Sequence, residues 1–345
     1  MRTLLSHQYV DRVSGRVLAE PLYADQLLRL VYAAPWEDRS WIVRAVTSAR
    51  TSQLLGFLNY DLPFGSMVWG IDRFVRQLGV DLDECVEPVE RLNSPRKLFQ
   101  RRIRYWETRP MDPEPDRIAA PADARLLVGS FGPQSPLFLK GKFFDFEELF
   151  GSDRPAWLAA FQGGDYAICR LTPDKYHYNH MPVSGVVCDI YELHGRYHSC
   201  NPGSVVVVET PYSKNTRTVT VVDTDVSDGS GVGLVALIEI VALMIGRIDQ
   251  CYSARRYESP LSVTAGMFLR KGQPKSLYRP GSSTTVAVFQ AGRVAFSQDL
   301  VQNMARTDVE SRFSSGFGRS LVETDVKVRS TIGCRRDERA VQEER

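Results

Sequence analysis

The chain has 345 residues, of which 43% are hydrophobic and 24% charged. This composition is typical of a globular protein and excludes disordered, collagen-like and coiled-coil chains. The 43 Lys and Arg residues exceed the 41 Asp and Glu residues by two, whereas a dedicated nucleic-acid-binding protein is usually strongly basic. We therefore expect no nucleic-acid partner. The length is sufficient for one large domain or two smaller ones.

Six scattered cysteines form no CxxC pair, which predicts reduced thiols in an intracellular protein. The first ten residues lack the apolar stretch of a signal peptide. The longest apolar run, residues 231–248, carries Glu239 near its middle. Because a central carboxylate is costly in a bilayer, we interpret this run as buried core rather than a membrane span.

Residues 1–110 are predicted to form a helical region. Apolar residues recur there at spacings of three and four in residues 25–34, 40–58 and 70–78. The stretch 91–109 then carries seven basic residues and one acidic one, with three aromatic residues interleaved. It indicates either a solvated helix face or a basic amphipathic surface that meets anionic lipid headgroups.

A Pro-rich connector, residues 110–121, precedes a region in which short β-prone runs alternate with turns. These runs lie at residues 125–129, 166–171, 185–193, 204–209, 216–223 and 284–290. We predict an α+β fold in which the helical region precedes a mostly antiparallel, β-rich core of residues 111–335. Residues 336–345 form a charged tail.

Three short segments carry the candidate chemistry. His177 and His180 lie three positions apart in DKYHYNHMP, a spacing that suits acid–base chemistry or metal ligation. No HExxH or CxxC pattern supplies further ligands, so we expect no metal site. Ser282 and Ser283 precede a β-prone run, and Asp123 lies in APADA. An Asp–His–Ser arrangement is compatible with these positions, but no GxSxG segment marks a hydrolase.

The order of the motifs is informative beyond any one of them. The segments are FVRQLGVDLD (74–83), LFQRR (98–102), APADA (120–124), KGKFFDFEELFG (140–151), RLTPDKYHYNHMPVSG (170–185), YHSCNPGSV (197–205) and GSSTTVAVF (281–289). Together they resemble the phosphatidylserine decarboxylase family, whose members cleave themselves to form a pyruvoyl group. One departure is Ala124, where the family has glycine.

The resemblance implies a role for each matching residue. Asp123 would orient His180, and His180 would act as the general base on Ser283. The Ser283 oxygen would then attack the preceding carbonyl in an N→O acyl shift. β-Elimination would leave a β-chain ending at Ser282 and an α-chain whose pyruvoyl group derives from Ser283. His177 would donate a proton during decarboxylation. Ser282 remains the alternative pyruvoyl precursor.

The same resemblance implies a phosphatidylserine decarboxylase proenzyme that forms phosphatidylethanolamine and CO2. Its partners would be a phospholipid substrate and an anionic membrane surface, with a cytoplasmic, membrane-peripheral location, and a homodimer is compatible with it. The alternatives are a pyruvoyl-dependent decarboxylase of a free amino acid, such as an aromatic one, and a non-processed lipid-binding relative.

Overall fold

The computed structural model describes residues 6–20, 79–133, 135, 143–207, 210–242, 247–280 and 283–336. The helices expected at 25–34, 40–58 and 70–78 lie outside these described residues, as do Ser282 and most of the charged tail.

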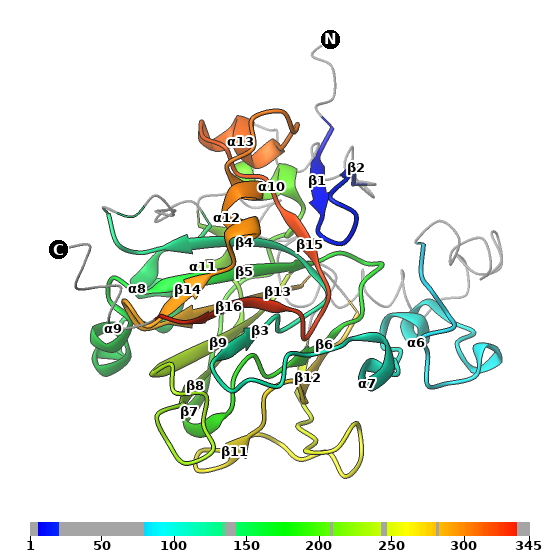
Figure 1. Cartoon of the computed structure of the whole chain (residues 1–345), viewed down its shortest axis with the longest axis horizontal. Coiled ribbons are helices and arrows are strands. Elements are labelled where there is room, and N and C mark those ends of the chain that lie inside the picture. The colour runs from blue at the N-terminus through cyan, green and yellow to red at the C-terminus, as the bar shows by residue number, and fades with distance from the viewer. Residues whose placement is uncertain are drawn as a thin grey trace.

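A ten-stranded sheet forms the centre of the molecule (Figure 1). All its pairings are antiparallel except the parallel pair of β1 with β15. The strand order is β11 (Phe268–Leu269), β7 (Gly185–Leu193), β8 (Arg217–Asp223), β9 (Leu234–Val241), β13 (Ser283–Phe289), β5 (Asp165–Leu171), β4 (Ala124–Ser130), β15 (Thr324–Val326), β1 (Gln8–Asp11) and β2 (Val17–Ala19).

Two three-stranded sheets accompany the large one. The first has the order β10 (Ile248–Gln250), β12 (Pro274–Tyr278) and β6 (Tyr178–His180). The second has the order β14 (Val294–Phe296), β16 (Thr331–Arg335) and β3 (Arg117–Ala119). The prediction of a β-rich, mostly antiparallel core is therefore confirmed.

Strand β13 lies in the middle of the large sheet, and all seven of its residues are buried. It pairs along its whole length with β5 on one side and β9 on the other. A strand covered on both faces favours a continuous β-branched and apolar run, which STTVAVF supplies. Glycine allows the chain to pass close to its far end, because a Cβ on Gly164 would lie 2.1 Å from the carbonyl oxygen of Phe289.

The described helices are short and lie around the sheets (Figure 1). Ser94 caps α6, whose first residue is proline, and Asp145 caps α8 through the Glu148 amide. Their bounds are η2 (Val89–Arg91), α6 (Pro95–Phe99), α7 (Tyr105–Thr108), α8 (Phe146–Phe150), α9 (Pro155–Phe161), α10 (Pro202–Val207), α11 (Pro211–Lys214), α12 (Gln298–Met304) and α13 (Arg312–Phe317).

Two sequence expectations differ from the structure. The predicted strand at residues 204–209 is wrong over its described part, since residues 204–207 belong to α10 (Pro202–Val207), which packs against α13. A short apolar run is compatible with either a strand or a buried helix, and the preceding proline favours a helix start here. In the region expected to be helical, residues 6–20 form the β1–β2 hairpin, and residues 79–110 contain η2, α6 and α7.

The β1–β2 hairpin is held to the sheet by a buried ionic cluster. Nε2 of His7 lies 2.8 Å from Glu323, and Arg170 donates to both Glu323 and Glu20. The side-chain ligand atoms of His7, Glu20 and Glu323 lie within 4.8 Å of one another. The Arg170 guanidinium pairs with both carboxylates, and Nε of Arg125 lies 3.8 Å from Glu20, so the cluster is a buried ion-pair network.

The apolar run of residues 231–248 contributes β9, whose last seven residues are buried. This agrees with its interpretation as core. Within the part of the chain that the structure describes, no helix is both long and apolar enough to cross a membrane.

Candidate active site

Strand β6 carries the histidine motif into the interior of the protein. It pairs antiparallel with β12, and the Tyr278 amide donates to the His177 carbonyl at 3.0 Å. The side chains of His177 and His180 are both fully buried. His180 therefore lies on a fixed strand and His177 directly before it, both out of contact with bulk water.

The imidazole of His180 has a hydrogen-bond partner at each nitrogen. Nδ1 lies 2.9 Å from the carbonyl oxygen of Gly272, which can only accept, so Nδ1 carries the proton. Nε2 then accepts from the Tyr176 hydroxyl at 2.9 Å. Burial lowers the pKa of His180 to about 3, so the ring is neutral at physiological pH.

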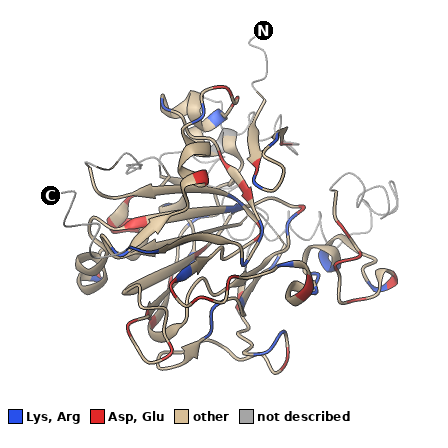
Figure 2. Cartoon of the chain, viewed as in Figure 1, with Lys and Arg blue, Asp and Glu red and all other residues tan. Residues whose placement is uncertain are grey.

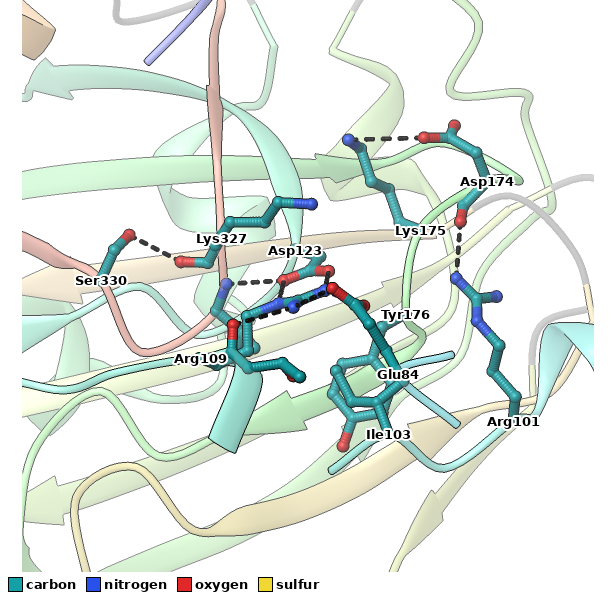
Figure 3. A network of polar contacts seen from close by, with 12 residues as sticks. Glu84, Arg101, Ile103, Arg109, Asp123, Asp174, Lys175, Tyr176, Lys327 and Ser330 are labelled. Atoms are coloured by element: carbon teal, nitrogen blue, oxygen red, sulfur yellow. Dashed lines mark hydrogen bonds and ion pairs between the residues drawn. The ribbon is translucent and has the colours of Figure 1, made fainter. Parts of the chain in front are cut away.

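Asp123 stands directly before β4 and is held by Arg109 (Figure 3). Arg109 donates to both carboxylate oxygens, at 3.0 and 2.8 Å, and the Val328 amide donates at 2.8 Å. Arg109 also forms two bonds of 2.7 Å to Glu84. Burial alone would raise the pKa of Asp123, but attraction to Arg109 outweighs it and holds that pKa well below its usual range.

The expected contact between Asp123 and His180 takes an indirect form. The hydrogen bonds of Asp123 go to Arg109 and Val328, and those of the His180 ring go to Gly272 and Tyr176. The chain brings the two residues near each other, because the His180 amide donates to the Pro121 carbonyl at 2.7 Å. The negative charge of Asp123 raises the pKa of His180, against the larger effect of burial. The orienting role of Asp123 stays a prediction.

His177 differs from His180 in that no described residue forms a hydrogen bond with its ring. Its ring stacks on Phe99 with a centroid distance of 3.5 Å, and both ring nitrogens are buried without a hydrogen bond. Burial, followed by repulsion from Arg101, lowers the pKa of His177 to about 3. Native proteins rarely leave buried polar atoms without a hydrogen bond, so these two nitrogens make His177 a candidate functional residue.

Ser283 is the first residue of β13, and its side chain is buried with no hydrogen-bond partner for Oγ. Strand β13 joins the histidine motif through Asn179, whose Oδ1 accepts from the Thr285 hydroxyl at 2.7 Å. Because Asn179 is two residues from His177 and Thr285 two from Ser283, the structure brings these two motifs together.

Tyr278 anchors the start of β13. Its hydroxyl donates to the Thr284 carbonyl at 2.8 Å and lies 2.9 Å from the Thr285 hydroxyl. Ser283 is therefore followed by residues held both by the sheet and by side-chain bonds.

A buried charged pair lies beside this segment. Glu239 and Lys275 are both fully buried and 2.8 Å apart, and Lys275 also donates to Gln250 at 2.8 Å. The Asn179 amide donates to Glu239 at 3.0 Å. Glu239 is the cross-strand neighbour of Thr285, so this network lies alongside the start of β13.

Sequence reasoning missed these supporting residues. It interpreted residues 91–109 as a face that meets water or lipid, but Arg101 and Arg109 are buried. Arg102 and Arg104 form ion pairs with Glu87 and Glu107, in a part of the chain that carries both basic and acidic residues (Figure 2). Glu239 within an apolar run and Lys275 within a short strand were signals of buried charges. The sequence did not show that the two residues pair with each other.

A buried serine, two buried neutral histidines and an ion-paired aspartate, each on a strand or directly before one, are features of an enzyme active site. The chain belongs to the phosphatidylserine decarboxylase family, whose model matches residues 96–314. The members of that family are carboxy-lyases.

Relatives with the name phosphatidylserine decarboxylase proenzyme are similar along most of their length. The protein from Bordetella petrii is 30% identical over 292 residues, which cover 80% of this chain and 93% of that one. The protein from Fusobacterium nucleatum is 25% identical over 310 residues, covering 90% and 95%. One from Chlamydia trachomatis is 27% identical over 311 residues, covering 89% and 95%.

Proposed function

We propose that this chain is a phosphatidylserine decarboxylase proenzyme that cleaves itself, acquires a pyruvoyl group and converts phosphatidylserine to phosphatidylethanolamine and CO2. The proposal depends on one observation: in a chain of this family, the histidine motif and the serine motif contact each other. Ser283 and His177 both present buried, unsatisfied polar atoms, and the Asn179–Thr285 bond joins their strands. Nothing in these contacts favours the non-processed alternative.

Maturation uses residues of this chain alone. The Ser283 oxygen attacks the carbonyl carbon of residue 282, and the peptide bond becomes an ester. A base then removes the Cα proton of residue 283 as its Cβ–O bond breaks, which leaves a carboxylate on residue 282 and a dehydroalanine at residue 283. Water then replaces the nitrogen of the former serine, which departs as ammonia. Pairing of β13 with β5 and β9 holds the new chain end in place.

His180 has the protonation state that a general base requires. Its neutral ring keeps a lone pair on Nε2, which accepts from the Tyr176 hydroxyl. Burial maintains that state by lowering the pKa of His180. In this proposal Asp123 acts on His180 through its charge and through the backbone bond to Pro121 rather than through a direct bond.

The residues around Ser283 fit a pyruvoyl group. The serine is buried, its oxygen has no partner to lose, and the following residues are anchored. The ketone of that group would supply the electron sink for loss of CO2. His177 is neutral, so one ring nitrogen carries a hydrogen that it can donate to the substrate carbon. Its stacking on Phe99 fixes the plane of the ring.

Membrane association, the cytoplasmic location and the division at residue 110 belong to the same proposal. Within the basic stretch, Arg91 and Lys97 are exposed, and exposed basic residues are attracted to anionic headgroups. The burial of Arg101 and Arg109 leaves fewer charges for a lipid surface than the seven in the sequence.

Intact mass spectrometry of fresh protein, with CO2 release assayed on phosphatidylserine and on free tryptophan, tests the proposal. We expect two fragments divided between residues 282 and 283, the second lighter than its hydrolysis product by one ammonia. The Ser283→Ala protein should remain one chain and release no CO2. An unbroken wild-type chain that decarboxylates would refute the pyruvoyl mechanism. Faster turnover of tryptophan would favour the amino-acid alternative.

A further inference from the structure

Arg101 is a buried cation that forms no salt bridge with any residue the structure describes. Arg101 belongs to the segment between α6 and α7 and is 6% exposed. Its guanidinium donates to two backbone carbonyls, those of Leu98 at 3.1 Å and Asp174 at 2.7 Å. The Asp174 carboxylate pairs with Lys175 instead (Figure 3). Nε of Arg101 is buried and has no hydrogen-bond partner.

Such an arrangement is costly unless an anion completes it. A buried charge loses its hydration, and hydrogen bonds to carbonyl groups offset only part of that free-energy cost. Arg109, eight residues further along, shows the usual solution, since two carboxylates share its guanidinium. No described residue forms a salt bridge of this kind with Arg101, whose unsatisfied Nε therefore suits an anionic oxygen from a ligand.

The neighbours of Arg101 place it at the active site. Phe99, two residues earlier, stacks on the His177 ring. Arg101 is also the charge that, after burial, contributes most to the lowered pKa of His177. Gln100 accepts from Arg279, four residues before Ser283, and its own Nε2 is buried without a partner. One short segment thus presents two unsatisfied donors next to the histidine and the cleavage segment.

The substrate of the proposed reaction carries two anionic groups, a carboxylate and a phosphodiester. An arginine bound to the carboxylate would stabilise the ground state and lose its partner as CO2 forms, which opposes catalysis. The phosphodiester keeps its charge throughout the reaction. Guanidinium groups also match phosphate oxygens in geometry and bind them with charge-assisted hydrogen bonds.

We propose that Arg101, assisted by the side-chain amide of Gln100, binds the phosphodiester of the substrate beside His177. This inference rests on the proposed function and deepens it, because it assigns the recognition of a phospholipid over a free amino acid to named donors. Self-cleavage involves no substrate, so it does not need these contacts.

The test compares Arg101→Gln and Arg101→Lys with the wild-type enzyme. The substrates are a short-chain, monomeric phosphatidylserine and an O-alkylserine that lacks the phosphate. Arg306→Gln is the control, because it removes a positive charge from an exposed pair with Asp308. We expect all four proteins to mature. Loss of a charge-assisted bond should raise KM for the phospholipid about 10- to 100-fold in Arg101→Gln, with a smaller change in kcat.

Arg101→Lys keeps the charge and should recover part of that loss. KM for the O-alkylserine should be the same in wild type and both variants. A wild-type enzyme that neither cleaves nor decarboxylates would refute the proposed function itself. If wild type is active but Arg101→Gln leaves KM for the phospholipid unchanged, the phosphodiester assignment is wrong. Equal losses on both substrates would assign Arg101 to the carboxylate instead and overturn the inference.

Gln100→Glu provides an independent test if Arg101→Gln does not fold. The substitution keeps an oxygen that can accept from Arg279 and replaces the unsatisfied donor by an anionic oxygen. It should raise KM for the phospholipid and leave that for the O-alkylserine unchanged. Unaltered KM for the phospholipid in Gln100→Glu would contradict the proposal.

Discussion

Replacing Arg109 by methionine should destabilise the protein strongly, because it leaves the Asp123 carboxylate buried without its cation. Arg109 is 3% exposed and Asp123 is 2% exposed, and two hydrogen bonds of 3.0 and 2.8 Å join them. Two hydrogen bonds to a charged group are worth about 3–6 kcal/mol together. Removal of one partner from a buried ion pair typically costs about 3–5 kcal/mol. We therefore expect a loss of about 3–5 kcal/mol in the free energy of unfolding at pH 7.

Urea denaturation measures this loss, with Ser283→Ala as the background of every protein so that the chain stays in one piece. The matched control is Arg306→Met, which breaks a solvent-screened pair with Asp308 and should change the free energy of unfolding far less than Arg109→Met does. Adding Asp123→Asn to Arg109→Met removes the unpaired charge and should restore part of the stability. A cost below about 1 kcal/mol for Arg109→Met, or strictly additive effects, would refute the reasoning.

The pH dependence has a definite sign. In wild type the pKa of Asp123 is lower in the folded protein than in the unfolded chain. The stabilisation is therefore present above the unfolded pKa and is lost as pH falls through the folded one. In Arg109→Met, burial would raise the folded pKa of Asp123, so protonation relieves the variant as pH falls. The stability difference between the two proteins should narrow from pH 7 to about pH 4.

Three further predictions concern processing and the buried pair. Ser283→Ala should abolish cleavage and Ser282→Ala should permit it, as a denaturing gel will show; the opposite pattern would make Ser282 the pyruvoyl precursor. His177→Ala should mature but lose decarboxylation, whereas His180→Ala should mature slowly or not at all, and normal turnover by mature His177→Ala would contradict the assigned role. Lys275→Met leaves a fully buried carboxylate unpaired and should cost about 3–5 kcal/mol in urea denaturation; a stability like that of wild type would show that the network is dispensable.

Much of the sheet follows from the sequence. The predicted runs at residues 166–171, 216–223 and 284–290 correspond, within one residue at each end, to β5, β8 and β13. Alternation of β-prone runs and turns is a local signal, so it survives without knowledge of the partners. The same local signal failed at residues 204–207, where a helix forms, because a short apolar run is compatible with the periodicity of either a strand or a buried helix.

The candidate residues were also within reach of the sequence, since the histidine, serine and aspartate segments stand in a recognisable order. The residues that surround these candidates could not be predicted from the sequence. The partners of Asp123 and His180 are Arg109 and Tyr176, and the ring beside His177 belongs to Phe99. Tyr176 is only four residues from His180, but the sequence does not show that the strand turns its hydroxyl to the ring. The contacts of Asp123 with Arg109 and of His177 with Phe99 join separate segments, so they depend on tertiary packing.

The basic stretch shows the limit most clearly. Residues 91–109 have the same charges in the sequence whether they face lipid, water or the protein interior. Only the packing of α6 and α7 against the histidine motif decides that Arg101 and Arg109 are buried while Lys97 is exposed. The sequence by itself determined the β-prone strands and the order of the chemical groups, because both are written in local residue types. The tertiary structure decided which groups are paired and which are unsatisfied, because burial and charge pairing depend on distances between segments far apart in the chain.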